Sequence, residues 1–376
     1  MAPTDQRRAW GWVAHLRAGG TSPWATWTEP AERAGRFLPG AQQLELLRRL
    51  NLAAGAPVPT ALADRVLEAS APGRGRADLE LVGADSRSSF GPRPVDPADL
   101  PDDELIRVAT NLLADDLVAA GPPRPAEPPL PRPGRRQYRL VGDPVLADPL
   151  RAQLVALRRP PGGRRPRVLV VGAPVDRMLA DAFAVRALDT GGPAWAEWVA
   201  ILAERDQIAP RVDLAQTARA WAGRTGAGRV TIVLEPGAVG RLVGVRRRLE
   251  VPPPLSADAV DLARRVAAVL GLIVPPERRA ALLRRRLAPR LADFPGSAPA
   301  VPGPHREWLT ARADRMRRQL DRAGYRVVGA RSGRDALDGV LPVYPPGGVV
   351  DVADDAVLRL AVALLLRGPR PEPEPT

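Results

Sequence analysis

Residues that could do chemistry gather in two short loops, each lying between an apolar run and a helical segment. Such a loop can bind phosphate, because the N-terminus of a helix offers free backbone N–H groups and the positive end of its dipole. The sequence therefore has two candidate positions for an anionic ligand. The candidate residues are Gly142, Asp143, Pro144 and Asp148 in the first loop, and Gly172, Pro174, Asp176, Arg177 and Ala180 in the second.

The first loop carries residues that disfavour an anion. Asp148 followed by Pro149 is typical of the N-cap and the first residue of a helix, and the Asp148 carboxylate would then accept the free N–H groups itself. Pro144 and Pro149 supply no N–H group, and Asp143 adds a second negative charge. Residues 142–150 contain no Lys, Ser or Thr. We expect this loop to serve the fold rather than to bind phosphate.

The second loop resembles a motif of the sulfotransferases that use phosphoadenosine phosphosulfate. In that family a first strand leads into a loop rich in Lys, Ser, Thr and Gly, which cradles the 5′-phosphosulfate. A later strand enters an Arg-(Asp/Asn)-Pro-x-Asp-x-x-x-Ser pattern, in which the Arg and the Ser hold the 3′-phosphate. Pro174 and Asp176 match this pattern, whereas Gly172, Ala173 and Ala180 stand at the positions of the Arg, of the Asp or Asn, and of the Ser.

The resemblance covers about residues 138–367 and includes the stretches 193–206, 229–236 and 305–342. It implies the P-loop-NTPase-like architecture of sulfotransferases, with both phosphate-binding loops lacking their cationic residues. Each lost charge-assisted contact costs about 1.5–3 kcal/mol. We therefore expect a non-catalytic sulfotransferase-like protein, a pseudoenzyme without a cofactor, that acts as a binding or accessory module for a protein or carbohydrate partner.

An active enzyme is the main alternative. Arg177 could replace the missing cationic groups together with Arg164, Arg165 and Arg167, which lie close to the two loops in sequence. Arginine binds phosphate with a geometry different from that of lysine. The result would be a transferase with an Arg-based site for phosphoadenosine phosphosulfate. The interpretation that we favour places Arg177 on the first helical turn, facing solvent.

The composition excludes several chemistries. The chain of 376 residues has no Cys and two His, and all of its 55 basic residues are Arg. Disulfides, thiolate metal sites, Schiff-base lysines and Walker-type lysines are therefore ruled out.

The net charge of +13 is unevenly distributed. Residues 1–120 hold 13 Arg and 16 acidic residues, a net of −3, so the rest of the chain carries +16. This excess suggests a third function, in which the basic segments 264–290 and 306–334 bind a polyanion with an affinity that falls steeply as salt rises. Nucleic acid is the less expected partner, because no aromatic residues are interleaved with these arginines to read bases.

Four apolar runs predict strands, and helical segments separate them. Strands that are nearly continuous in apolar residues are typically buried on both faces. Their alternation with helices implies a mainly parallel sheet with flanking helices, so the predicted fold class is α/β. The predicted strands are 137–142, 167–172, 229–234 and 325–329.

A smaller α-rich domain is predicted at 1–120, followed by a Pro-rich linker at 121–136 and the α/β domain at 137–367. In the first domain we expect four tryptophans, at positions 10, 12, 24 and 27, to form a small core rather than an exposed ligand platform. Ser256 is expected to cap a helix and Gly271 to follow its end. Helices are predicted at 41–52, 60–69, 101–120, 256–271, 277–288, 305–323 and 353–367.

The chain shows no signal for a membrane segment. The first residues lack an apolar h-region, and the longest apolar run, 356–366, is too short to span a bilayer and contains Arg359. We expect a cytoplasmic protein with no membrane span and a disordered tail at 368–376.

Overall fold

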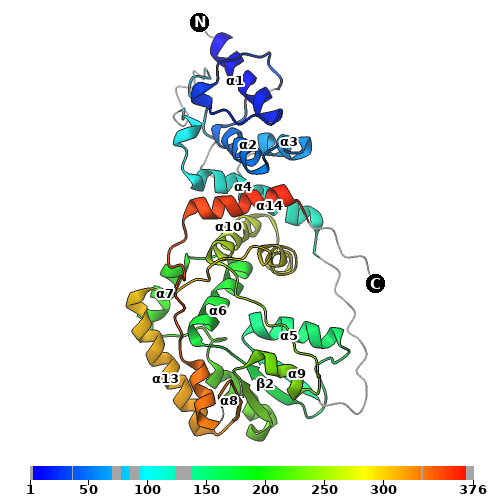
Figure 1. Cartoon of the computed structure of the whole chain (residues 1–376), viewed down its shortest axis with the longest axis vertical. Coiled ribbons are helices and arrows are strands. Elements are labelled where there is room, and N and C mark those ends of the chain that lie inside the picture. The colour runs from blue at the N-terminus through cyan, green and yellow to red at the C-terminus, as the bar shows by residue number, and fades with distance from the viewer. Residues whose placement is uncertain are drawn as a thin grey trace.

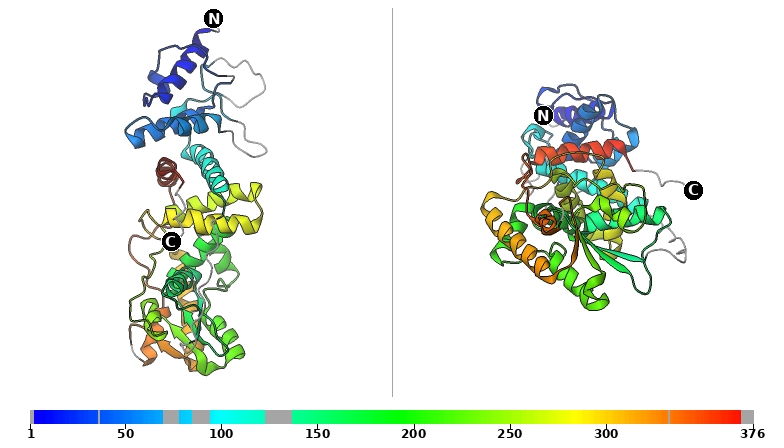
Figure 2. Two further views of the ribbon diagram at one scale, coloured as in Figure 1. Left: turned by 90° about the vertical axis from the view of Figure 1, so that its right-hand side faces the viewer. Right: turned by 60° about the horizontal axis from the view of Figure 1, so that its bottom comes forward.

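The computed structural model describes residues 3–35, 37–69, 78–84, 94–122, 137–331 and 333–369. The molecule is elongated, with a parallel sheet near one end and the N-terminal helices at the other (Figure 1). A layer of helices from the second half of the chain lies between them, as the side view also shows (Figure 2).

The sheet has four strands, all parallel, in the order β1-β2-β3-β4. Each predicted strand is confirmed to within two residues. Because the spatial order follows the chain order, the sheet contains no point at which the direction of winding reverses. The strands are β1 (Tyr138–Gly142), β2 (Arg167–Val171), β3 (Val230–Val233) and β4 (Arg326–Val328).

The two central strands explain the apolar runs of the sequence. Four of the five residues of β2 and all four of β3 are buried, so both faces of these strands are covered. The edge strands are less buried, with Arg139 of β1 and Arg326 of β4 exposed. A parallel sheet needs cover on both faces, and the flanking helices provide it. They are α5 (Pro144–Ala156), α6 (Val175–Thr190), α7 (Trp195–Glu204), α8 (Leu214–Thr225), α9 (Val239–Leu242) and α13 (Arg306–Ala323).

Helix α6 connects the sheet to the helical part of the molecule. It begins just after β2 and packs against α10 at its other end (Figure 1). The remaining helices of the described residues are α1 (Pro3–Arg17), α2 (Ala41–Ala54), α3 (Thr60–Glu68), α4 (Asp102–Ala120), α10 (Ala257–Ile273), α11 (Pro276–Leu282), a π-helical turn at Leu283–Leu287, α12 (Ala288–Leu291) and α14 (Asp354–Arg367). Short 3-10 turns lie at Trp24–Thr26, Pro97–Asp99, Ala227–Arg229, Pro236–Ala238, Gly303–His305 and Gly333–Val340.

The buried residues form two hydrophobic cores. One surrounds the sheet and includes α6, α8 and α13. The other joins α1 to α4 with α10, α11 and α14, so helices from both ends of the chain share it. Helix α14 lies directly against α4 (Figure 1). The N-terminal helices are therefore packed on the C-terminal helix as well as on one another.

The predicted tryptophan core is confirmed for three of its four members. Trp10, Trp12 and Trp24 are at most 3% exposed, and the rings of Trp12 and Trp24 lie 5.4 Å apart. Trp27 is less buried and stacks on His15 at 4.3 Å. The aromatic area of these rings is used inside the protein, as expected for a short segment that must build a core.

The end of the helix predicted at 256–271 was predicted wrongly. Ser256 caps α10 as expected, accepting the Ala259 N–H at 3.2 Å, but Gly271 lies inside the helix, which continues to Ile273. The prolines at 275 and 276 end the helix, because a residue that precedes a proline favours an extended conformation. Val274 adopts this conformation, with φ −134° and ψ 150°. The other predicted helices are confirmed to within about one turn at their ends.

Most of the predicted linker, 123–136, and most of the predicted tail, 370–376, lie outside the described residues. Of the helices in the described part of the chain, none combines the length and the apolar character that crossing a membrane requires.

Candidate functional site

The first loop lies at the carboxyl end of β1 and is shorter than predicted. Asp143, not Asp148, is the N-cap of α5, and its Oδ1 accepts the Val145 N–H at 2.9 Å with Pro144 as the first helical residue. The prediction that Asp148 caps the helix is wrong: Asp148 lies in the second turn and pairs with Arg151 at 2.6 Å on the surface. The sequence contains two Asp-Pro pairs five residues apart, and each has the features of a helix start.

Gly142 brings the ends of β1 and β2 into close contact. It has φ 108°, and a Cβ at this position would lie 2.1 Å from the backbone O of Val171. The Asp143 N–H donates to the same carbonyl at 3.0 Å. The loop is therefore held against the neighbouring strand.

Asp143 is buried beside a second carboxyl group, that of Asp181 on α6, and each residue is 1% exposed. Burial is the main cause that raises the pKa of Asp143 to about 8, and the negative charge of Asp181 is the second cause. The hydrogen bond from the Val145 N–H opposes the rise. Burial raises the pKa of Asp181 as well, while Arg177 opposes the rise. No described residue donates a hydrogen bond to Oδ2 of Asp143. The Asp143 carboxyl is therefore protonated at neutral pH.

The second loop lies at the carboxyl end of β2, and neighbouring side chains fill it. A Cβ on Gly172 would lie 2.4 Å from Cδ1 of Leu214 and 3.2 Å from Sδ of Met178. Pro174 is the residue before α6, and Ala180 is buried in the second turn of that helix. An arginine at position 172, where the sulfotransferase motif has one, would require Leu214 to move.

The charged residues of the second loop bind other parts of the chain. Asp176 accepts the backbone N–H groups of Val343 and Tyr344 at 3.2 and 3.0 Å, which fixes the segment before α14 on the first turn of α6. Arg177 donates to Asp181 at 3.3 Å and to the Pro252 carbonyl at 2.7 Å. The prediction that Arg177 faces solvent is wrong, because its side chain is 26% exposed and both contacts are internal.

The structure thus brings Asp143, Asp176, Arg177 and Ala180 together around the first turns of α6 and leaves Asp148 outside the group. A cavity of about 110 Å³ adjoins them, and its polar lining includes Asp176, Arg177, Arg306 and Tyr344. Arg306 is directed to the Val301 carbonyl and lies over the Tyr344 ring at 5.1 Å. Sequence reasoning did not identify Asp181, because its role depends on contact between α5 and α6.

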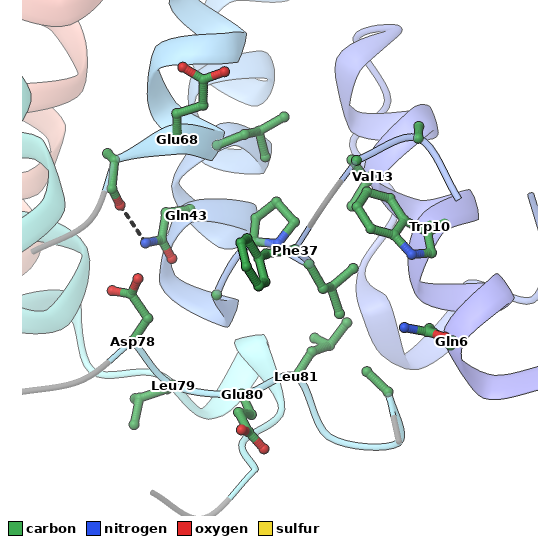
Figure 3. Close-up of a pocket in the computed structure, with 18 of the residues that line it drawn as sticks. Gln6, Trp10, Val13, Phe37, Gln43, Glu68, Asp78, Leu79, Glu80 and Leu81 are labelled. Carbon is green, nitrogen blue, oxygen red and sulfur yellow. Dashed lines mark hydrogen bonds between the residues drawn. The ribbon is translucent and has the colours of Figure 1, made fainter. Parts of the chain in front are cut away.

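A larger cavity lies elsewhere, in the N-terminal helical part, with a volume of about 740 Å³. It opens between α1, the start of α2, the end of α3 and the loop residues 78–84 (Figure 3). Its walls combine apolar side chains with Gln43, Asp78 and Trp10, each of which has a buried polar atom with no hydrogen-bond partner among the described residues. The tryptophans were the only sequence signal near this cavity, and a small core was the favoured interpretation for them.

Comparison of the chain with protein-family models, with curated proteins and with solved structures gave no match in any of the three searches.

Proposed function

We propose that the protein is a non-catalytic α/β protein that acts as a binding or accessory module, as the resemblance to sulfotransferases with altered donor loops implies. The observation that carries the proposal is that the chain itself occupies the ends of β1 and β2. Asp143 caps α5, Leu214 fills the space beside Gly172, and Asp176 holds residues 343 and 344. A phosphate group would have to displace these contacts.

The order of the strands supports the same proposal. In open α/β sheets, ligands bind in the crevice that forms where the strand order reverses. The order β1-β2-β3-β4 contains no reversal, so the four described strands provide no such crevice.

An Arg-based donor site is less well supported, because Arg177 already binds Asp181 and the Pro252 carbonyl. Releasing it would leave a buried carboxylate without its cation, and such a loss costs several kcal/mol. The alternative of a polyanion-binding surface on the basic helices is also less well supported, because these arginines have partners within the chain. Arginines of these segments are paired within the protein, as in Arg264–Asp261, Arg284–Asp189, Arg312–Asp206 and Arg317–Asp338.

Isothermal titration of the full chain with adenosine 3′,5′-bisphosphate tests the proposal. We expect no heat of binding at ligand concentrations up to about 1 mM, where even a weak complex would be detected. Binding at micromolar affinity would overturn the proposal. If that binding were lost in Arg177→Gln but kept in Arg151→Gln, the conclusion would instead be an Arg-based donor site. Arg151 is the control because it belongs to the neighbouring helix α5, where it pairs with Asp148.

A further inference from the structure

We propose that a groove of about 400 Å³ between α6 and α7 binds a small organic anion, a molecule with a carboxylate group on an apolar body. Its volume lies within the range of small-molecule sites in proteins. The groove begins after the first turns of α6, away from the ends of the strands, so the inference does not depend on the proposed function. Its described lining residues all belong to 182–211, a range that the structure describes without a gap.

Helical spacing brings the apolar walls of the groove together. On α7, Trp198 and Leu202 are four positions apart and share one face of the helix. Trp198 is 7% exposed, and its ring lies 5.4 Å from that of Phe183 and 5.9 Å from that of Trp195, which holds this wall in place. The turn before α8 supplies residues 209–211. On α6 the lining residues also recur every three or four positions, at 182, 185, 186, 189 and 190.

Two arginines give the groove its positive charge. Arg186 and Arg211 are exposed lining residues, and neither forms an ion pair with another described residue. Asp189 is the one acidic residue among the described lining residues, and it is already paired. Its carboxylate accepts a hydrogen bond from Nε of Arg284 at 2.6 Å and a second one from Nη2 of the same guanidinium. The two lining arginines are therefore available to an anion, whereas the one carboxylate is not available to a cation.

The combination of apolar walls and unpaired arginines selects the class of ligand. A guanidinium can hold a carboxylate through two parallel hydrogen bonds, which gives the contact both strength and direction. Apolar groups beside the arginines reduce the exposure of such a pair to water, and opposite charges then attract more strongly than on an open surface. An inorganic anion would leave the wall of Trp198 and Leu202 unused, and a neutral apolar ligand would leave the arginines without a partner.

Isothermal titration of the full chain at low salt with three test ligands examines this proposal. Phenylpropionate supplies the anion, phenylpropanamide is its neutral analogue, and acetate carries the charge without the apolar body. We expect phenylpropionate to bind about fivefold or more tightly than the amide, and this preference should shrink as salt screens the arginines. Acetate should not bind. A preference for phenylpropionate over the amide of less than about twofold, binding of acetate as tight as that of phenylpropionate, or no binding of phenylpropionate at about 10 mM would overturn the proposal.

Four variants locate the site. Arg186→Gln and Arg211→Gln change exposed side chains, and each should weaken phenylpropionate by about threefold while leaving the amide unchanged. Leu202→Ala removes part of the apolar wall and should weaken both ligands. Arg205→Gln is the matched control, since Arg205 is an exposed arginine at the end of α7 that does not line the groove. If the control weakened phenylpropionate as much as the first two variants, the binding would reflect the general charge of the protein, and the assignment would be refuted.

Discussion

The buried pair of Asp143 and Asp181 makes a prediction about stability and pH. We consider the change Asp143→Asn, which keeps an oxygen to accept the Val145 N–H and replaces the other oxygen by a neutral amide group beside Asp181. Asparagine is as good an N-cap as aspartate. The substitution therefore imitates the protonated form of Asp143 and removes its titration.

The magnitude follows from the pKa of Asp143, which is about 8 in the folded protein instead of its ordinary value of 3.8. The folded state thus holds a proton that the unfolded chain releases above about pH 4. The stabilisation from this proton is complete below about pH 4 and is lost as the pH rises towards 8, at about 1.4 kcal/mol per pH unit. Between about pH 5 and pH 7 the wild-type protein should lose about 3 kcal/mol relative to Asp143→Asn.

Urea denaturation at several pH values measures this difference. The free energy of unfolding of Asp143→Asn, minus that of the wild type, should increase with pH up to about 8 and then stay constant. Asp148→Asn is the control, because it makes the same chemical change on the same helix at a side chain that is 55% exposed. Its effect should stay within about 0.5 kcal/mol and show little pH dependence above about pH 5. A difference for Asp143→Asn that does not change with pH would refute the assignment of a proton to the pair.

Two further substitutions test the packing. Arg265→Leu removes a guanidinium that bonds carboxylates of α4, α10 and α14, and we expect the free energy of unfolding, measured by urea denaturation, to fall by about 2–3 kcal/mol. Arg359→Leu, at an exposed ion pair within α14, should lower the free energy of unfolding by less than about 1 kcal/mol. Gly142→Ala should lower the free energy of unfolding by about 3 kcal/mol or more, because the new Cβ would lie 2.1 Å from the Val171 carbonyl oxygen. Gly55→Ala is also at positive φ but in open space, and it should lower the free energy of unfolding by about 1 kcal/mol. Equal costs within either pair would contradict the packing argument.

The strands were predictable because their signal is local. Residues 168–171 are apolar, and so are residues 230–233 except Thr231. Such runs are needed only where a parallel sheet is covered on both sides. The helix starts were less certain. The Asp-Pro pairs at 143 and 148 have the same features, and only the position of the end of β1 decides that the first one caps α5.

The contacts between distant segments could not be predicted from one sequence. Asp181 contributes to the site through the packing of α6 on α5, and the segment around Tyr344 reaches Asp176 across 168 positions of the chain. The cavity of the N-terminal part also depends on contacts between distant segments, because its polar atoms come from α1, α2 and residues 78–84. Periodicity assigns a face to each helix, but it does not say which faces meet.

The contacts around the start of α6 bear on the proposal that the loops at the strand ends do not bind phosphate. The group holds three carboxyl groups, those of Asp143, Asp176 and Asp181, and a single cation, that of Arg177. Asp176 and Arg177 each fix another segment of the chain through hydrogen bonds. An incoming phosphate would find the Arg177 cation already bound to Asp181 and would also compete with these contacts. The same residues that stabilise the junction between sheet and helices therefore oppose an anionic ligand, and the nucleotide titration measures the sum of both effects.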